Sequence, residues 1–322
     1  MTSLRFDDRV AVVTGAGNGL GRAYALELAR RGAAVVVNDV GSTVSGGEHS
    51  DDPADRVVDE IVAAGGAALA DHHSVADAAH GESIVERALH GFGRIDIVVN
   101  NAGILRDRPL EDMTYEEWED VQNVHLNGTF HVTQAAWRHM KRQRYGRIIS
   151  TASGAGIFGN AGHANYGAAK MGVVGLTRMV AVEGRSVGVN ANIVAPAALT
   201  RMSTSSGKRT RGSDVMGTLF KDFRPELVAP LVAWLAHESC PTTGEIFSAG
   251  GGRVARVFIA EADGWVDLDI SAEKLRDEWE DICSPERGFT VPRSMSDEIA
   301  QMVADFTAKT KAPVTSSEAV PR

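Results

Sequence analysis

The stretch VAVVTGAGNGLGRAYALELARRGAAVVVND, residues 10–39, decides the fold. Its two ends, 10–15 and 34–39, are short apolar runs rich in valine, a composition typical of buried β-strands. Between them, residues 21–32 space their alanines and leucines as a helix does. A strand, a helix and a second strand in so short a span predict two parallel strands joined by a covering helix.

The turn between the first strand and the helix is rich in glycine. Glycine lets the backbone turn tightly and come close to a pyrophosphate, whose charge then meets the positive end of the helix. The candidate cofactor-binding residues of this turn are Gly15, Gly17, Asn18, Gly19, Leu20 and Gly21. Glycines at this spacing also occur in ordinary turns, so the prediction depends on the flanking strand and helix.

The second strand ends at Asp39. A carboxylate at this place can accept hydrogen bonds from a ribose 2′-hydroxyl and would repel a 2′-phosphate. The sequence therefore favours NAD over NADP. The alternative is that Asp39 serves only as a helix cap or a turn residue.

Further apolar, β-branched runs follow along the chain and alternate with helical stretches such as residues 116–143. These runs lie at residues 95–103, 146–151, 187–196 and 244–251. Strands that are apolar throughout and alternate with helices predict a parallel sheet covered on both faces. The predicted fold is α/β: a single Rossmann-like, doubly wound parallel sheet with a C-terminal extension.

The sequence predicts three regions. We expect a dinucleotide-binding catalytic domain at residues 1–252, within which the polar residues 200–220 are typical of a loop over a site. Residues 253–309 form an extension that we expect to pack on this domain, with a helix that begins after the N-cap Ser271. Residues 310–322 are polar and are expected to be a flexible tail.

Charge and cysteine usage bear on the partners and the cellular setting. Acidic side chains outnumber basic ones by 42 to 33, and the net charge of −9 argues against nucleic acid or an anionic membrane as a partner. The amino terminus lacks a secretory pattern, and Cys240 and Cys283 show no CxxC spacing, so we expect a reduced, cytoplasmic setting. The histidines fit no ligand set, so we expect no metal; the most prominent are His72, His73, His125, His131 and His163.

A second motif lies in SGAGIFGNAGHANYGAAK, residues 153–170. Tyr166 and Lys170 are four positions apart, so on a helix both point to one side. An ammonium group and an oxidised nicotinamide both favour phenolate, and are expected to lower the Tyr166 pKa until it can exchange a proton with an alcohol or ketone. Ser153 can hold the substrate oxygen. A tyrosine and a lysine four positions apart often occur by chance. Together with the glycine-rich turn, however, this spacing indicates proton and hydride transfer.

These residues resemble the short-chain dehydrogenase/reductase family over about residues 7–252. The matching motifs are TGxxxGxG at Gly15, Gly19 and Gly21, NNAG at residues 100–103, and the trio Ser153, Tyr166 and Lys170. More narrowly, NNAGILRDR and GNAGHANYGAAK resemble the (3R)-hydroxyacyl-CoA dehydrogenase unit of the peroxisomal multifunctional enzymes of type 2, which are similar to 17β-hydroxysteroid dehydrogenase type 4.

The resemblance implies a role for each matching position. Tyr166 would be the general acid/base, Lys170 would bind the nicotinamide ribose and tune Tyr166, and Ser153 would stabilise the substrate oxygen. Further cofactor contacts would be Asn101, Ala102, Gly103, Pro196 and Thr200. The fourth catalytic position of the family, usually asparagine, is His125 here, and a histidine can also bond the water of a proton relay. His73 replaces the carboxylate that usually meets adenine.

Three functions remain open. The first is NAD-dependent interconversion of (3R)-hydroxyacyl-CoA and 3-ketoacyl-CoA, with a fatty or sterol-derived acyl chain. The second is oxidation of free hydroxysteroids or terpenoid alcohols, and the third is a non-catalytic NAD-binding sensor. Basic residues of the polar loop could meet CoA phosphates or simply face solvent; they are Arg201, Lys208, Arg209 and Arg211. The resemblance also implies a homodimer or homotetramer formed through helices at about residues 116–143 and 166–185.

Overall fold

The computed structural model describes residues 3–45, 52–198 and 223–311. The chain divides into two compact units, Met1–Val257 and Phe258–Arg322. The first unit holds the glycine-rich turn and the Tyr166 motif. The second contains most of the predicted extension, whose packing on the first unit stays a prediction. Residues 200–220 of the predicted loop and 312–322 of the predicted tail lie outside the described residues.

An eight-stranded sheet forms the centre of the first unit, in the order β3-β2-β1-β4-β5-β6-β7-β8. The strands are β1 (Val10–Thr14), β2 (Ala34–Asn38), β3 (Ala67–Asp71), β4 (Ile97–Asn100), β5 (Gly146–Thr151), β6 (Val189–Pro196), β7 (Ile246–Gly250) and β8 (Arg253–Val257). Neighbours from β3 to β7 pair in parallel, and β8 pairs antiparallel with β7. The order reverses at β1, between β2 and β4. The predicted doubly wound α/β fold is thereby confirmed.

Two of these strands were not among the predicted apolar runs. β3 reads AALAD, which contains no β-branched residue and so carries no strand signal of its own. β8 reads RVARV and is largely exposed, as an edge strand is. It also extends the sheet beyond residue 252, where the sequence predicted the boundary of the catalytic domain.

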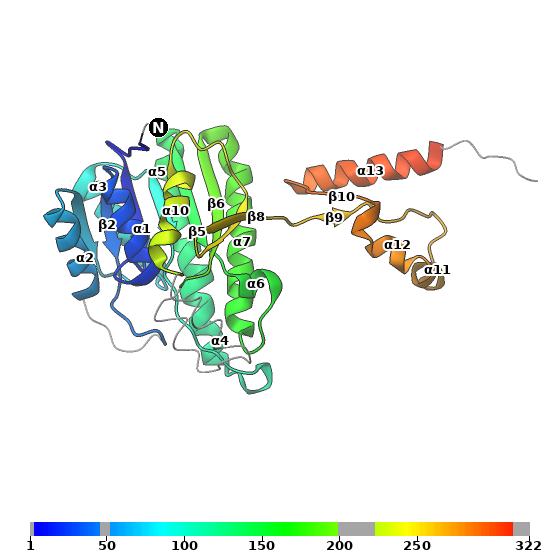
Figure 1. Cartoon of the computed structure of the whole chain (residues 1–322), viewed down its shortest axis with the longest axis horizontal. Coiled ribbons are helices and arrows are strands. Elements are labelled where there is room, and N and C mark those ends of the chain that lie inside the picture. Colours follow the sequence, from blue (N-terminus) through cyan, green and yellow to red (C-terminus); the bar gives the residue numbers. More distant parts are fainter. Residues whose placement is uncertain (1–2, 46–51, 199–222, 312–322) are drawn as a thin grey trace, which may run out of the picture. The chain divides into compact units, whose positions relative to one another are not determined.

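Helices cover both faces of the sheet (Figure 1). One layer contains α1 (Gly19–Arg30), α2 (Asp52–Ala63) and α10 (Ala229–Ala236), and the other contains α3 (Ala78–Phe92), α5 (Gly128–Gln143) and α7 (Ala164–Gly184). Successive residues of a strand point to opposite faces. Ala11 and Val13 of β1 accordingly pack on the first layer, and Val10 and Val12 on the second. Strands apolar along their whole length are thus explained by burial on both sides.

The helix predicted at residues 116–143 is interrupted. α4 (Tyr115–Gln122) begins at a capping box, in which Thr114 and Glu117 exchange hydrogen bonds, and runs into a π-helical turn (Asn123–Asn127) before α5. Such turns insert an extra residue and are frequent at functional sites. Here the turn contains His125, which is only 2% exposed.

Each unit contains further helices and turns. The first unit also contains α6 (Gly154–Phe158) and the 3₁₀ turns Leu110–Asp112, Arg185–Val187 and Pro225–Leu227. The second contains the hairpin of β9 (Glu261–Ala262) and β10 (Phe289–Thr290), the helices α11 (Ala272–Asp277), α12 (Trp279–Cys283) and α13 (Met295–Lys311), and the 3₁₀ turn Pro285–Arg287. Ser271 caps α11 through the backbone nitrogen of Lys274, as predicted. None of the described helices is long and apolar enough to cross a membrane.

Candidate active site

A cavity of about 570 Å³ lies at the carboxyl edge of the sheet, where the loops after β1, β2, β4 and β5 meet the start of α7. The predicted site residues that line it are Gly15, Asn18, Gly19, Leu20, Asp39, Asn101, Ala102, Gly103, His125, Ser153, Tyr166, Lys170 and Pro196. Thr200 lies outside the described residues. Open α/β sheets bind ligands at this edge, and the volume is that of a small-molecule site.

The glycine-rich turn is shaped by positions where a side chain would not fit. Gly15 adopts a left-handed φ of 62°, and an added Cβ would lie 2.7 Å from the Cα of Ala102. At Gly21, an added Cβ would collide with the carbonyl oxygen of Gly15, so this glycine lets α1 start directly against the turn. A Cβ at Gly17 would lie 2.5 Å from that of Pro53. Gly17 and Gly21 therefore shape the turn rather than line the cavity.

The amino-terminal end of α1 contributes to the cavity wall. Asn18 is the N-cap of this helix, and its side chain caps no amide among the described residues. The N–H groups of the first turn and the positive end of the helix dipole can therefore meet an anion. Together with the close-packed glycines, this end of α1 fits the pyrophosphate of a dinucleotide.

Asp39 is held in place by backbone amides at the end of β2. Its Oδ2 accepts a hydrogen bond from the nitrogen of Gly17 at 2.8 Å, and its Oδ1 accepts one from the nitrogen of Gly41 at 2.7 Å. The carboxylate thereby joins β2 to the glycine-rich turn. It lines the cavity beside Ser42 and Thr43, so its remaining lone pairs can face a ribose.

The predicted NNAG segment, at the end of β4, holds the glycine-rich turn in place through hydrogen bonds. The side-chain nitrogen of Asn101 donates to the carbonyl oxygens of Thr14 and Gly15, each at 3.1 Å. The hydroxyl of Thr14 in return accepts hydrogen bonds from the backbone nitrogens of Asn101 and Ala102. Asn101 thus holds the turn that would carry the cofactor as well as lining the cavity. Sequence analysis did not identify the contribution of Thr14.

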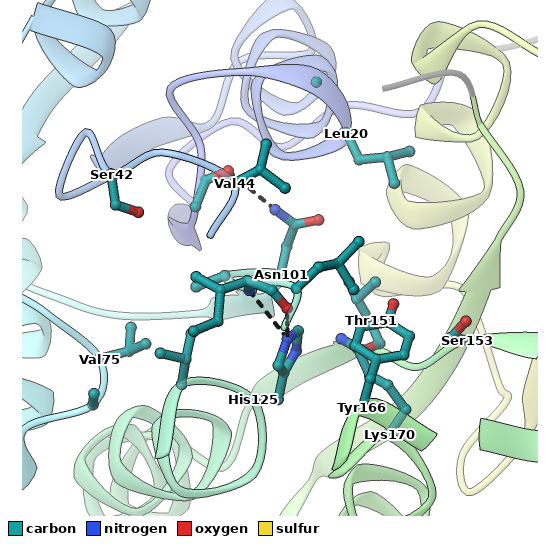
Figure 2. A pocket seen from close by; sticks show the side chains of 18 of the residues that line it. Leu20, Ser42, Val44, Val75, Asn101, His125, Thr151, Ser153, Tyr166 and Lys170 are labelled. Carbon is teal, nitrogen blue, oxygen red and sulfur yellow. Dashed lines mark hydrogen bonds between the residues drawn. The ribbon is translucent and has the colours of Figure 1, made fainter. Parts of the chain in front are cut away.

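Tyr166, Lys170 and Ser153 come together at one end of the cavity (Figure 2). The Lys170 Nζ lies 5.6 Å from the centroid of the Tyr166 ring and donates to the carbonyl oxygen of Thr151 at 2.6 Å. Ser153 is the N-cap of α6 and accepts from the nitrogen of Ala155 at 3.2 Å. Its side chain also lowers the pKa of Tyr166. The three predicted catalytic side chains therefore meet at one wall.

The electrostatics of this wall differ from the expectation from sequence. Burial raises the pKa of Tyr166 above its ordinary value, although the side chain of Ser153 acts in the opposite direction. Burial also lowers the pKa of Lys170 to about 7, so its ammonium group is only partly present at neutral pH. The predicted lowering of the Tyr166 pKa is therefore not found in the protein alone, because desolvation outweighs the opposing effect of Ser153.

His125 is fixed beside Tyr166 by the π-helical turn. Its Nε2 lies 2.8 Å from the carbonyl oxygen and 3.1 Å from the nitrogen of Ile104, and its ring meets that of Tyr166 edge-on with centroids 5.1 Å apart. Burial, and then the charge of Lys170, hold the His125 pKa well below its ordinary value, so the ring is neutral. Its Nδ1 is buried and has no partner among the described residues. The expected relay role stays a prediction, and this Nδ1 is the atom that would bind the water.

Asn165 is a further site residue that sequence analysis missed. It is fully buried, and its side-chain nitrogen donates to the carbonyl oxygens of Arg106 at 3.0 Å and Glu117 at 2.9 Å. Its Oδ1 accepts from the nitrogen of Tyr166 at 2.7 Å. Asn165 therefore fixes the start of α7 and the place of Tyr166. The signal was an asparagine in the first turn of a helix, where its side chain can reach neighbouring backbone groups.

Comparisons with known proteins identify the family of the chain. Residues 9–211 match the short chain dehydrogenase family. The peroxisomal multifunctional enzyme type 2 of Mus musculus is 47% identical over 284 residues, which are 87% of this chain and 37% of that protein. The solved structure of the full-length Drosophila melanogaster enzyme of the same name has a TM-score of 0.78 at 39% identity, over 96% of this chain and 51% of that one. The resemblance inferred from the motifs is confirmed.

A second solved structure matches at nearly full length. It is a short chain dehydrogenase from Mycobacterium avium, with a TM-score of 0.72 at 38% identity, over 86% of this chain and 94% of that chain. The chain thus spans about half or less of the two multifunctional enzymes named above and most of the mycobacterial protein. Its fold, its cavity and these matches show that the chain is an oxidoreductase of the short-chain dehydrogenase/reductase family.

Proposed function

We propose that the protein interconverts (3R)-hydroxyacyl-CoA and 3-ketoacyl-CoA with NAD as the cofactor. The observation that carries this proposal is the convergence of Ser153, Tyr166 and Lys170 with the glycine-rich turn on one cavity. The names of the most similar relatives support the substrate class. A family resemblance supports chemistry more strongly than it supports a substrate, so the substrate has to be tested directly.

The chain supplies the groups for proton transfer at the substrate oxygen. A bound nicotinamide dinucleotide, whose pyrophosphate the turn and the end of α1 would hold, would supply the hydride exchange. The hydroxyl of Tyr166 would take the proton of the alcohol during oxidation and return it during reduction. Ser153, which lines the same cavity as Tyr166, would hold the same oxygen. Lys170 lies against the Tyr166 ring, and its charge would favour the phenolate.

Asp39 supports NAD as the cofactor. Its carboxylate, which accepts hydrogen bonds from two backbone amides, would repel the 2′-phosphate of NADP. We expect Asp39→Ser to reduce the preference of kcat/KM for NAD over NADP by about 10- to 100-fold, since it removes both a ribose acceptor and a repulsive charge. Parallel kinetics with the two cofactors would measure the ratio. Asp59→Ser, on the exposed face of α2, is the matched control. An unchanged ratio in Asp39→Ser would remove the basis for NAD.

The choice between a thioester and a free alcohol needs paired substrates. The basic residues Arg201, Lys208, Arg209 and Arg211 lie outside the described residues, so their part in binding CoA stays a prediction. We expect kcat/KM for a 3-hydroxyacyl-CoA to exceed that of the corresponding free hydroxy acid by about 10²-fold or more, because the CoA moiety adds binding energy in the transition state. Equal values, or a preference for free hydroxysteroids, would favour the second function.

Assembly and location remain part of the proposal. Several large apolar side chains of α5 and α7 are exposed in the single chain, which supports a homodimer or homotetramer through these helices. They are Phe130, Met171, Met179 and Val182. Light scattering of the purified protein would give the number of subunits. The multifunctional relatives are named as peroxisomal, and the cytoplasmic location of this chain stays a prediction.

A further inference from the structure

The cavity continues past Asp39 to the loop that follows β3. Its lining at this end includes His73, Ser74, Val75 and Ala76. The strands β2 and β3 pair in parallel, and the backbone nitrogen of Asp39 donates to the carbonyl oxygen of Asp71 at 3.0 Å. The loop after β3 therefore lies beside the carboxylate proposed to meet the ribose. Because the pyrophosphate would lie on the other side, at α1, we expect the base of the dinucleotide at this end.

The ring of His73 is held in place by buried polar groups. Its Nδ1 lies 2.9 Å from the Oδ2 of Asp71, which is only 4% exposed. The Oδ1 of Asp71 accepts from the side-chain nitrogen of Asn38 at 2.7 Å and from the backbone nitrogen of His73 at 3.1 Å. The ring of His80, on α3, packs against that of His73 with centroids 4.9 Å apart. The sheet and α3 therefore orient this imidazole before any ligand binds.

Asp71 also decides which nitrogen of His73 carries the proton. An ionised carboxylate can only accept, so Nδ1 is the donor, and in a neutral imidazole the lone pair is then on Nε2. The hydrogen bonds of His73 among the described residues are made by its backbone and by Nδ1. The side chain is 45% exposed. Nε2 is therefore an acceptor that a ligand in the cavity can use.

Adenine matches such an acceptor at one group only. The ring nitrogens on its edges accept hydrogen bonds, and the 6-amino group donates them. Hypoxanthine carries a carbonyl oxygen in place of this amino group. An acceptor at the same place would therefore pair with adenine and would set two lone pairs against each other with hypoxanthine.

The neighbouring side chains do not make this distinction. The hydroxyl of Ser74 accepts from the backbone nitrogen of Ala76 at 3.3 Å, and a hydroxyl can turn to donate or to accept. His72 does not line the cavity, and its Nε2 lies 3.5 Å from the Oδ2 of Asp55 on α2. Among the described side chains at this end of the cavity, His73 is therefore the one that can tell an amine from a carbonyl.

We propose that His73 selects adenine as the base of the cofactor by accepting a hydrogen bond from its 6-amino group through Nε2. Asp71 is the positioning residue, because it fixes the tautomer that leaves Nε2 unprotonated. This role rests on the NAD cofactor proposed above and is independent of the substrate.

The test is the binding of two reduced dinucleotides, followed by nicotinamide fluorescence at pH 8, above the range in which imidazole ordinarily gains a proton. The probes are NADH and reduced nicotinamide hypoxanthine dinucleotide, which differ only in the base. We expect the wild type to bind NADH about three- to tenfold more tightly. His73→Gln should make the two affinities about equal, because a glutamine amide can turn to accept or to donate. His72→Gln, at the neighbouring histidine, is the matched control and should keep the wild-type ratio.

Asp71→Asn tests the assignment of the tautomer. The amide oxygen of the new side chain can keep the hydrogen bonds from Asn38 and from the His73 backbone, so its nitrogen would donate to Nδ1 of His73. Nε2 would then carry the proton and donate to the hypoxanthine carbonyl. We expect the preference to be reversed in favour of the hypoxanthine dinucleotide. A purely structural role of Asp71 would weaken both affinities and leave their ratio unchanged. If circular dichroism shows that this variant does not fold, His73→Gln decides alone.

The outcomes separate this proposal from the proposed function. Equal wild-type affinities, a wild-type preference for hypoxanthine, or a wild-type ratio retained in His73→Gln would overturn the role of His73 and leave NAD as the cofactor. A protein that bound neither dinucleotide would overturn both. Because binding needs no substrate, a lack of turnover with acyl-CoA would refute only the proposed substrate.

Discussion

Tyr166→Phe is expected to lower kcat/KM by about 10²- to 10⁴-fold, the range that a positioned general acid/base contributes. The substitution removes one hydroxyl and leaves the ring, so the edge-on contact with His125 and the neighbouring Lys170 can remain. NADH formation from the best alcohol measures the rate. Affinity for NADH should change little, because no part of the glycine-rich turn is altered.

Tyr145→Phe is the matched control for this prediction. The Tyr145 ring contacts the guanidinium groups of Arg9 and Arg147, whose central carbons lie 3.9 and 4.5 Å from the ring centroid, and it does not line the cavity. It should therefore keep the wild-type rate. If Tyr166→Phe also kept a rate comparable with that of the wild type, the acid/base would have to be another group and the proposed chemistry would be wrong.

Lys170→Met should lower kcat/KM by about 10²- to 10³-fold, because the phenolate loses its adjacent positive charge and the expected ribose contact is lost. The same change should stabilise the protein. Burial lowers the pKa of Lys170 in the folded state to about 7, whereas an unfolded lysine titrates near pH 10.4. Below pH 7 this difference disfavours folding by on the order of 4 kcal/mol, partly offset by the hydrogen bond to Thr151.

The sign of this effect fixes its pH dependence. Because the folded pKa lies below the unfolded one, the destabilisation is fully present below about pH 7 and disappears as the pH rises toward about 10. Urea unfolding at pH 7 should show Lys170→Met more stable by about 1–3 kcal/mol, with the gain shrinking as the pH rises. Lys141→Met, at an exposed position of α5, should change neither rate nor stability. A loss of stability in Lys170→Met at neutral pH would contradict the buried, weakly charged amine.

Much of the fold and of the site could be predicted because the decisive residues are close in the sequence. The glycine-rich turn, Asp39 and the pair Tyr166 and Lys170 each belong to a local motif whose backbone geometry or helical spacing is fixed. β3 was missed because AALAD has no local strand preference and is held in the sheet by its neighbour β2. The π-helical turn was missed because a hydrophobic period near 3.6 does not reveal one inserted residue.

Contacts between distant segments could not be predicted. Asp107 and His163 lie in two separate stretches that resemble the family, and neither stretch indicates that they pair. They meet because the loop after β4 bridges to the start of α7. The raised pKa of Tyr166 depends on burial, which is a property of the folded protein rather than of the spacing between Tyr166 and Lys170. Spacing therefore identifies the chemical groups, and tertiary packing sets their protonation.

The two hydrogen bonds that Asp39 accepts from backbone amides have a consequence for attempts to change the cofactor preference to NADP. Its carboxylate fastens β2 to the backbone nitrogen of Gly17 as well as meeting a ribose, so replacing it with a basic residue would release that amide. The glycine-rich turn would then be less well ordered, and its affinity for NAD and for NADP would fall. Successful redesign would have to provide a substitute acceptor for the Gly17 amide, and a single charge reversal would give a poor enzyme for both coenzymes.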